Sequence, residues 1–234
     1  IGLSGSATVR EALVSDEIDL YWEYTGTGWT NYLQGTAEDR PEDLYSAVAE
    51  QDLENNDVRW LEPAPLNNTY AIAAKQDYVE ESGITQLSQV SQADDQSLCA
   101  ASEFINRDDG LPGLEDAYGV DFSVSEMDLG LIYTQVGGEC NFGEVFATDG
   151  RIIEQNLQVL EDDQDFFVPY NAALTLREGV YQENAEALEE LFGPISEALT
   201  NETMTDLNAA VDVEGESPED AARQFLVDNG FISG

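Results

Sequence analysis

Apolar and polar positions along the chain switch repeatedly between a period typical of strands and a period typical of helices. Strands are expected at residues 18–24, 58–61, 70–74, 98–101, 142–148, 152–160 and 166–176, and helices at 9–13, 29–33, 41–53, 114–118 and 129–136. From residue 184 onward the pattern is helical, and Ser217-Pro218 is a typical helix start, with a capping serine followed by proline. This alternation predicts an α/β layered fold with mostly parallel sheets.

The chain contains no long flexible linker, so two domains, if both are present, must share strands. The extended segments 68–74 and 166–173 suit such crossings. With 234 residues and 42% hydrophobic content, the chain can bury one large core or two modest ones. It has no apolar run long enough to span a bilayer, and it begins with Ile1 and without a signal-peptide pattern. We therefore expect that an upstream segment has been removed.

Acidic residues dominate the charge of the chain, with 49 Asp and Glu against 8 Lys and Arg and a net charge of −41. Such a charge destabilises a compact state by self-repulsion in dilute buffer. At about 1 M salt the Debye length falls to about 3 Å, so a carboxylate-covered surface becomes tolerable. The acids are spread along every segment, which favours a halophilic protein over a nucleic-acid mimic or a metal buffer. Binding to nucleic acid is disfavoured by the sign of the charge.

The chain has no histidine, which removes the usual general base, the Ser-His and Cys-His pairs and the commonest transition-metal ligand. Cys99 and Cys140 are too few and too far apart in the sequence for a zinc knot. They are expected either to form a disulfide, as in many exported proteins, or to remain two buried thiols. No metal site and no cofactor are expected.

The segment Glu17–Gly28, EIDLYWEYTGTG, ends an apolar strand in aromatic residues and continues into a glycine-rich turn. A tyrosine face attracts a cation through its quadrupole, and a glycine-rich turn that opens a helix offers backbone N–H groups to an anion. A small molecule with both charges would suit this motif. The alternative is that Tyr21, Trp22 and Tyr24 are core aromatics and that the glycines only form a turn. Trp22 and Trp29 are interpreted as core residues.

Five segments in the same order and at similar spacing resemble the substrate-binding proteins of ABC importers for glycine betaine, proline betaine and choline. They are VREALVSDEIDLYWEYTGTG, NNTYAIAAKQDY, EFINRDDGLPGLEDAYG, FGEVFATDGRI and FFVPYNAALTLRE, and together they span most of the chain. The resemblance implies a periplasmic-binding-protein fold of type II, in which two α/β lobes joined by two crossover strands close over the ligand. Residues 1–69 and 172–234 would form lobe I, and residues 70–171 lobe II. Relatives carry a further strand and helix before the stretch that matches Ile1, so lobe I is expected to be N-terminally incomplete.

The resemblance also implies which residues bind the ligand: Tyr24, Thr27, Asn68, Tyr70, Arg107, Phe146 and Tyr170. The four rings would form a cage for a quaternary ammonium group, which has no N–H to donate and is best bound by electron-rich faces. Arg107 and Thr27 would bind the ligand carboxylate, since the guanidinium fork suits bidentate pairing. The alternative for Arg107 is a salt bridge to Asp108, Asp109 or another acid. Phe146 stands where relatives often have tyrosine, a change expected to be mild.

The implied function is a non-catalytic receptor on the outer side of the cell membrane. It would bind glycine betaine or a related quaternary ammonium osmolyte and deliver it to an ABC permease, which fits a halophilic setting. Two alternatives stay open: a hydrolase that uses paired carboxylates, such as a glycoside hydrolase, and a ligand-sensing domain of the same fold fused to a permease or regulator. No carboxylate pair stands out against the acidic background, which weakens the hydrolase interpretation.

Overall fold

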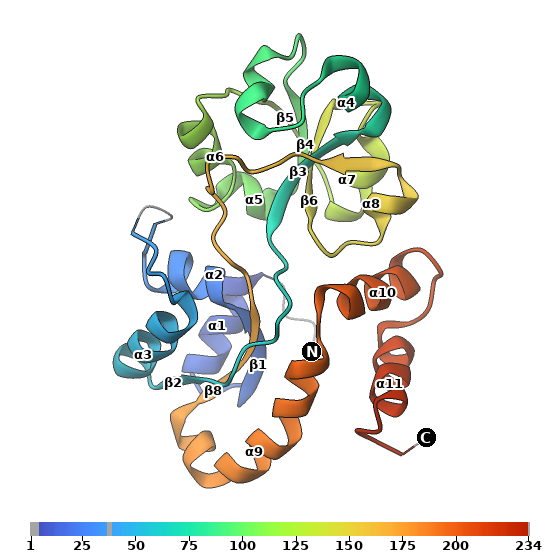
Figure 1. The fold of residues 1–234 in the computed structure, drawn as a ribbon. Helices are drawn as coiled ribbons and strands as arrows, with labels where there is room; N and C mark the ends of the chain where they lie inside the picture. The colour runs from blue at the N-terminus through green and yellow to red at the C-terminus, as the bar shows by residue number, and fades with distance from the viewer. Residues whose placement is uncertain (1–4, 37–38, 234) are drawn as a thin grey trace. The chain divides into compact units, whose positions relative to one another are not determined.

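The computed structural model describes residues 5–36 and 39–233, and the chain divides into two compact units. Unit 1 comprises Ile1–Asn68 and Val168–Met204, and unit 2 comprises Thr69–Phe167 and Thr205–Gly234 (Figure 1). The lobe I expected from the sequence includes residues 1–4, 37–38 and 234, which lie outside the described residues. Among the described residues, no helix is both long enough and apolar enough to cross a bilayer.

Unit 1 is built on a sheet in the order β1-β8-β2, formed by β1 (Leu20–Tyr24), β8 (Ala172–Arg177) and β2 (Val58–Trp60). Strands β1 and β2 both pair with β8 in antiparallel orientation, and the register places Tyr24 opposite Ala172. The helices of this unit are α1 (Ser6–Val14), α2 (Thr25–Thr27), the π-helix η1 (Gly28–Tyr32), α3 (Leu44–Asn56) and α9 (Glu178–Ala198).

A buried ion pair and close packing hold the helices of unit 1 to its sheet. The Arg10 guanidinium of α1 pairs with both carboxylate oxygens of Asp52 in α3, and the indole Nε1 of Trp60 donates to the same carboxylate at 2.7 Å. A Cβ at Gly28 would lie 2.8 Å from Val48 and 2.9 Å from Trp60, so the backbone of η1 approaches α3 and β2 as closely as only glycine allows. The helical turns after Tyr24 therefore rest directly on the core.

Unit 2 is built on a mixed sheet in the order β5-β4-β6-β3-β7. Its strands are β3 (Tyr70–Lys75), β4 (Ser97–Ala100), β5 (Ser123–Glu126), β6 (Phe142–Phe146) and β7 (Leu157–Val159). Its helices are α4 (Gln76–Ser82), the 3₁₀-helix η2 (Leu87–Gln92), α5 (Ser102–Asn106), α6 (Leu111–Tyr118), α7 (Leu129–Gln135), α8 (Arg151–Glu154) and α11 (Pro218–Asp228). Helix α10 (Asn201–Asp212) begins in unit 1 and continues into unit 2.

Cys99 and Cys140 form a disulfide that joins β4 to the segment before β6. Both residues are buried in a core cluster with Ile132, Tyr133 and Val145. The bond therefore fastens the centre of the unit 2 sheet to the loop that precedes β6, the strand that ends at Phe146.

The expectation of mostly parallel sheets was wrong. Only β4 pairs in parallel, with β5 and with β6, while β3 and β8 run antiparallel to their neighbours in the described ladders. Strands β3 and β8 follow the segments that pass from one unit to the other, at residues 68–69 and 167–168. The hydrophobic pattern reports which residues form strands, but it does not report the direction in which such a strand enters a sheet.

Two segments expected as long strands are only partly strand. Helix α8 occupies Arg151–Glu154 and so includes the start of residues 152–160, and in the turn before it the Asp149 carboxylate accepts from the backbone N–H of Arg151 at 2.9 Å. Only Leu157–Val159 forms a strand, β7. Within residues 166–176, the strand β8 begins at Ala172, and the preceding residues pair with the other connecting segment through a single bridge between Asn67 and Asn171.

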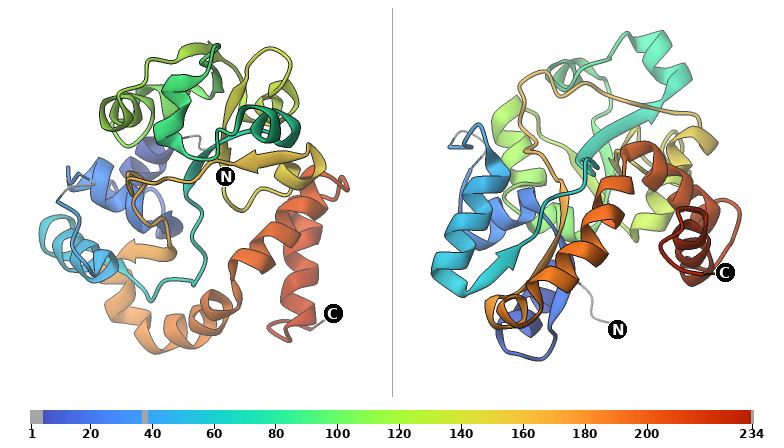
Figure 2. Two further views of the ribbon diagram at one scale, coloured as in Figure 1. Left: turned by 45° about the horizontal axis from the view of Figure 1, so that its top comes forward. Right: turned by 60° about the horizontal axis from the view of Figure 1, so that its bottom comes forward.

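Helix α9 begins at Glu178, before the expected start at residue 184, and it is not straight. Asn184 has a non-helical φ of −136°, and Pro194 lies inside the helix, so the chain bends along its length (Figure 2). The last helix begins as expected, since the Ser217 hydroxyl accepts from the backbone N–H of Asp220 at 3.1 Å.

Unit 2 includes the range Thr205–Gly234, which was expected from the sequence to belong to lobe I. The side chain of Asn208 donates to the Thr148 carbonyl at 3.1 Å, and Arg151 lies 3.4 Å from Asp212. The backbone of α10 also approaches Gly150 so closely that a Cβ there would lie 2.8 Å from Ala209. These contacts join α10 to the turn that follows β6.

Candidate functional site

Tyr24 lies at the end of β1, where the strand gives way to the helical turn of Thr25–Thr27. Its hydroxyl accepts a hydrogen bond from the Asn68 side-chain amide at 3.2 Å. Burial raises the pKa of the Tyr24 phenol, so the ring stays neutral. The turn is held by Thr25, whose hydroxyl donates to the Pro169 carbonyl at 2.9 Å and accepts from the backbone N–H of Asn171 at 3.0 Å.

Tyr170 packs its ring against the backbone of Gly26. A Cβ at position 26 would lie 2.6 Å from two carbons of that ring, so no other residue fits here without displacing it. The Tyr170 backbone N–H donates to Asn67 at 2.8 Å, and its carbonyl accepts from the backbone N–H of Asn68 at 3.0 Å. Unit 1 thus brings together Tyr24, Asn68 and Tyr170, with Thr27 buried in the adjoining turn.

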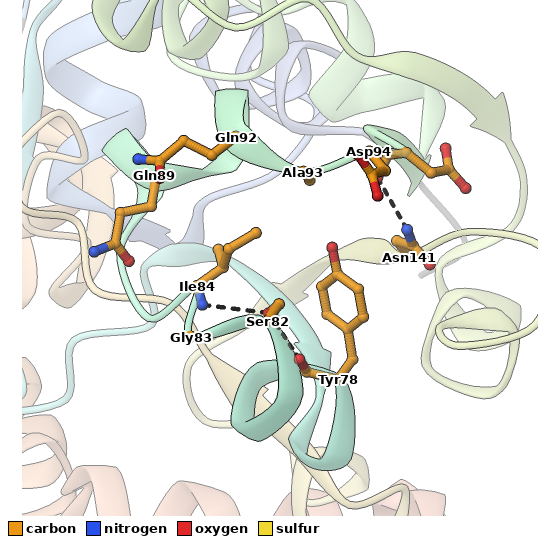
Figure 3. A pocket seen from close by; sticks show the side chains of 10 residues that line it. Tyr78, Ser82, Gly83, Ile84, Gln89, Gln92, Ala93, Asp94 and Asn141 are labelled. Carbon is orange, nitrogen blue, oxygen red and sulfur yellow. Dashed lines mark hydrogen bonds between the residues drawn. The ribbon is translucent and has the colours of Figure 1, made fainter.

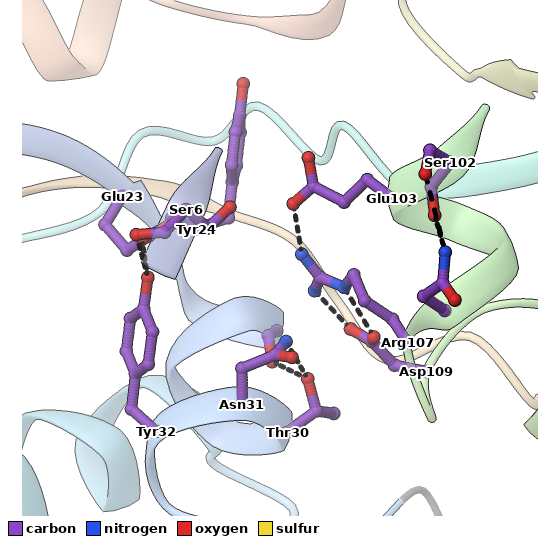
Figure 4. A network of polar contacts seen from close by, with 12 residues as sticks. Ser6, Glu23, Tyr24, Thr30, Asn31, Tyr32, Ser102, Glu103, Arg107 and Asp109 are labelled. Atoms are coloured by element: carbon purple, nitrogen blue, oxygen red, sulfur yellow. Dashed lines mark hydrogen bonds and ion pairs between the residues drawn. The ribbon is translucent and has the colours of Figure 1, made fainter. Parts of the chain in front are cut away.

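A buried carboxylate that the sequence analysis did not single out lies beside Tyr24. Glu23 accepts from the Tyr32 hydroxyl at 2.6 Å (Figure 4). It also accepts from the Tyr21 hydroxyl at 3.0 Å and from the Tyr24 backbone N–H at 2.7 Å. Burial, and then the charge of Glu23, raise the pKa of both phenols well above the usual range. Tyr21 therefore holds the Glu23 carboxylate. The only sequence signal was an acid inside an aromatic strand.

Trp22 and Trp29, the tryptophans in and just after the segment Glu17–Gly28, differ in burial. Trp29 is 9% exposed, and its indole Nε1 donates to the Thr36 carbonyl at 2.9 Å, so its interpretation as a core residue is confirmed. Trp22 is 36% exposed and lies edge-on to Phe192 at a centroid distance of 6.4 Å. Its interpretation as a core residue was wrong, because alternation along β1 turns it to the face opposite the buried Glu23.

In unit 2 the rings of Tyr70 and Phe146 lie opposite each other at the ends of β3 and β6. Their centroids are 5.0 Å apart with an interplanar angle of 33°. Two further rings contact Tyr70: Phe104 at 5.2 Å and Phe167 at 6.4 Å. The sequence analysis missed both. Phe104 is fully buried and supports Tyr70 from α5, the short helix that leads to Arg107.

Arg107 reaches the same ring cluster. Its Cζ lies 5.7 Å from the Tyr70 ring centroid. Its Nε and Nη2 donate to the two carboxylate oxygens of Asp109 at 2.7 and 2.5 Å, and its Nη1 donates to Glu103 at 3.0 Å (Figure 4). The salt bridge to Asp109, one of the two interpretations offered for Arg107, is thus present. It fixes the guanidinium beside the rings, and a pairing with a ligand carboxylate stays a prediction.

Phe146 is held by a network centred on Tyr133. The Tyr133 hydroxyl accepts from the Phe146 backbone N–H at 3.1 Å, and the Arg151 guanidinium lies 4.3 Å from the Tyr133 ring centroid. Arg151 also makes a bidentate pair with Asp149 at 2.9 and 2.5 Å. Burial acts to raise the pKa of the Asp149 carboxyl, but the hydrogen bonds from Arg151 outweigh it and lower that pKa. Asp149 therefore stays ionised and fixes the turn after β6.

Glu144 is a second buried acid that the sequence analysis did not consider. It lies on β6, two residues before Phe146, and is 1% exposed. One carboxylate oxygen accepts from the backbone N–H of Ala101 at 2.7 Å. Burial raises the pKa of the Glu144 carboxyl to about 7.

Two surface cavities lie within single units. One, of about 390 Å³, is in unit 2, where Tyr78, Ile84 and Asn141 are among its lining residues (Figure 3). The other, of about 350 Å³, is in unit 1, where Tyr45 and Tyr181 are among them. Neither cavity is lined by a residue that the resemblance assigns to the ligand. In the described part of the chain, no cluster of His, Cys, Asp and Glu is arranged to hold a metal ion.

Two α/β units joined by paired connecting segments define a solute-binding protein with the type II periplasmic-binding-protein fold. A solved structure described as "Crystal structure of glycine betaine/carnitine/choline ABC transporter" has this fold, with a TM-score of 0.79 at 26% identity over 98% of this chain and 85% of that chain. The chain belongs to the OpuAC family, described as "Substrate binding domain of ABC-type glycine betaine transport system", which matches residues 1–228.

Individual relatives agree with this family. A "Glycine-betaine-binding protein" of Pseudomonas aeruginosa is 36% identical over 97% of this chain and 77% of its own length. The "Glycine betaine-binding protein YehZ" of Escherichia coli is 32% identical over 99% of this chain and 80% of its own length. The family and fold class predicted from the five sequence segments are thereby confirmed.

Proposed function

We propose that this chain is the extracytoplasmic receptor of an ABC importer and that it binds glycine betaine or a related quaternary ammonium osmolyte. The observation that carries this proposal is the arrangement of Tyr70, Phe146 and Arg107 within unit 2. The centroids of the two rings lie 5.0 Å apart, and the guanidinium carbon lies 5.7 Å from the Tyr70 centroid. A zwitterion whose cation and carboxylate are separated by one methylene group needs both kinds of partner within a few ångströms.

The rings of Tyr24, Tyr70, Phe146 and Tyr170 bind the trimethylammonium group in this proposal. Such a group has no N–H, so hydrogen-bond acceptors cannot select it, whereas each ring face contributes about 0.5–2 kcal/mol of cation–π attraction. Burial raises the pKa of Tyr24 and of Tyr70, which keeps both phenols neutral across the physiological range. Asn68 orients the Tyr24 ring through its hydroxyl.

The ligand carboxylate is bound by Arg107 and Thr27 in this proposal. The Asp109 and Glu103 carboxylates already contact the Arg107 guanidinium and set its orientation. Binding would therefore exchange or share one of these contacts with the ligand. Glycine betaine and proline betaine can make this contact, and choline cannot, since it carries a hydroxyl in place of the carboxylate.

The family consists of solute-binding domains of transport systems, and we propose that this chain likewise has no catalytic activity and acts with an ABC permease. The comparisons lend no support to the glycoside hydrolase alternative. A ligand-sensing domain of the same fold would bind the ligand with the same rings. It would differ only in the partner protein that recognises its ligand-bound form.

The test is a calorimetric panel in concentrated salt with glycine betaine, proline betaine and choline. We expect dissociation constants in the micromolar range, which correspond to about −8 kcal/mol. Tyr170→Ala should weaken binding at least tenfold, while Trp22→Ala, which removes an exposed ring of the same unit, should bind as the unchanged protein does. No binding of any of the three ligands by folded protein would contradict the proposal. Equal affinity for choline and glycine betaine would remove Arg107 from the site.

A further inference from the structure

Glu144 shares one face of the unit 2 sheet with the ring pair. In the antiparallel ladder between β3 and β6, Phe146 lies opposite Tyr70 and Glu144 lies opposite Ile72. Residues opposite each other, and residues two positions apart on one strand, are on the same face. At about 3.3 Å per residue, the Glu144 side chain starts about 7 Å along β6 from that of Phe146.

The Glu144 carboxylate also fixes the helix that carries the rest of this cluster. It accepts from the backbone N–H of Ala101, the residue that caps α5. Helix α5 then presents Phe104 to the Tyr70 ring and ends at Arg107. One acid on β6 thus sets where α5 begins, and α5 in turn sets the positions of a supporting ring and of the guanidinium.

The charged groups that act on Glu144 are of both signs. Burial is the largest cause and raises the pKa of the Glu144 carboxyl to about 7, the hydrogen bond from Ala101 lowers it, the charge of Glu103 on α5 raises it and Arg107 lowers it. Burial raises the pKa of the Tyr70 phenol, Arg107 lowers it, and the charges of Glu103 and Glu144 raise it further. Asp109 pairs with Arg107, and its charge also raises the pKa of Tyr70. A cation bound at the rings of Tyr70 and Phe146 would therefore be attracted by the negative charge of an ionised Glu144.

We propose that Glu144 is a positioning residue that couples the release of one proton to the binding of a cation at the rings of Tyr70 and Phe146. This inference rests on the proposed function and adds a regulation to it. When the cation binds, the O–H bond of the neutral Glu144 carboxyl breaks and the proton passes to the solvent buffer. The carboxylate keeps the electron pair and its hydrogen bond from Ala101, so α5 stays in place while the negative charge favours the ligand.

The coupling predicts that affinity for quaternary ammonium ligands increases as pH rises through the range in which Glu144 titrates. For a one-unit shift in the pKa of a single group that titrates near pH 7, we expect about a fivefold gain between about pH 6 and about pH 8, and about tenfold over the whole titration. Choline and glycine betaine should gain alike, because the effect acts on the cation they share. By linkage, the bound cation should lower the pKa of the Glu144 carboxyl by the same one unit.

The test is titration calorimetry of the unchanged protein, Glu144→Gln and Glu126→Gln in concentrated salt, at both pH values and in two buffers of different ionisation enthalpy. The Glu144→Gln variant keeps a side-chain oxygen that accepts from Ala101 and removes the titration. Glu126 is an exposed acid at the end of β5 in the same sheet and serves as the matched control. We expect the unchanged protein and Glu126→Gln to release a fraction of a proton on binding near pH 7 and to show the pH-dependent gain, and Glu144→Gln to show neither.

The inference is overturned if the unchanged protein binds its ligand with no proton release and no change in affinity, or if Glu144→Gln keeps both. In either case the proposed function stands, because binding itself is observed. If no ligand binds at either pH, the proposed function fails and this inference fails with it. The buffer comparison needs only the unchanged protein, so a poorly folded variant does not remove the test.

Discussion

Gly26 lies against the ring of Tyr170, so close that a Cβ at position 26 would be 2.6 Å from two ring carbons. The glycine of the opening motif is therefore required by a residue far along the chain. Gly26→Ala should displace the Tyr170 ring and weaken betaine binding at least tenfold, while far-ultraviolet circular dichroism shows an intact fold. Gly179→Ala, at a helical glycine with nothing within 4 Å of the added Cβ, is the matched control and should bind normally. Unchanged affinity in Gly26→Ala would show that the Tyr170 ring does not contact the ligand.

Asn68 should act through Tyr24. Asn68→Ala removes the hydrogen bond to the Tyr24 hydroxyl and should weaken binding by about three- to tenfold, the usual effect of about 1 kcal/mol for one hydrogen bond. Asn68→Asp should retain binding, because the hydroxyl can donate to the new carboxylate and the added negative charge favours a cation. Calorimetry on both variants checks this. Equal losses in both would mean that the amide itself, rather than its bond to Tyr24, is what matters.

Stability should fall as pH rises through the titration of Glu144. Its pKa is about 7 in the folded protein and 4.5 when unperturbed, so the folded state binds more protons than the unfolded state between these values. The free energy of unfolding is therefore highest below about pH 4.5, as far as this group is concerned, and loses about 3 kcal/mol by about pH 8. Urea unfolding in concentrated salt at several pH values measures this. Glu144→Gln should remove most of the loss between about pH 4.5 and about pH 7, and Glu126→Gln should not.

Reduction of the disulfide should destabilise unit 2. Cys99 and Cys140 are 41 residues apart, and a loop of that length corresponds to about 4 kcal/mol of chain-entropy stabilisation. Thermal unfolding with and without a strong reductant should show a lower midpoint after reduction. The double substitution of both cysteines by serine provides the control, because its midpoint should not respond to reductant. A midpoint that reduction leaves unchanged would place the stability of unit 2 in its packing alone.

The sequence predicted those features that are determined by a few neighbouring residues. The helix start at Ser217 and the strand that ends at Tyr24 were expected and are present, since capping and alternation act over a few residues. Strand direction was not predictable, because β3 and β8 take their pairing from the connections between the units. The stretch around Ile152 was predicted as a strand, but its start is a helical turn that follows the turn in which the Asp149 carboxylate accepts from the Arg151 backbone N–H.

Among the candidate site residues, too, those within local sequence motifs were predicted and those defined by contacts between distant segments were not. The rings of Tyr70 and Phe146 were proposed because they lie within the segments that resemble the family, and the structure pairs them across β3 and β6. Phe104 and Glu144 were missed because their importance comes from contacts across strands and helices that no spacing reveals. For Arg107 the sequence did not say which acid would form a salt bridge, and the structure identifies Asp109 and Glu103 as partners.

The most direct test of the central claim is a comparison of glycine betaine with 3,3-dimethylbutanoate, in which a carbon replaces the quaternary nitrogen. The two ligands share their shape and their carboxylate, and only glycine betaine carries the cation. Calorimetry in concentrated salt should give a micromolar dissociation constant for glycine betaine and binding at least 100-fold weaker for the carbon analogue, since two or more cation–π contacts of about 1–2 kcal/mol each are lost. Equal affinity for both ligands, or no binding of glycine betaine by folded protein, would contradict an aromatic cation site in this chain.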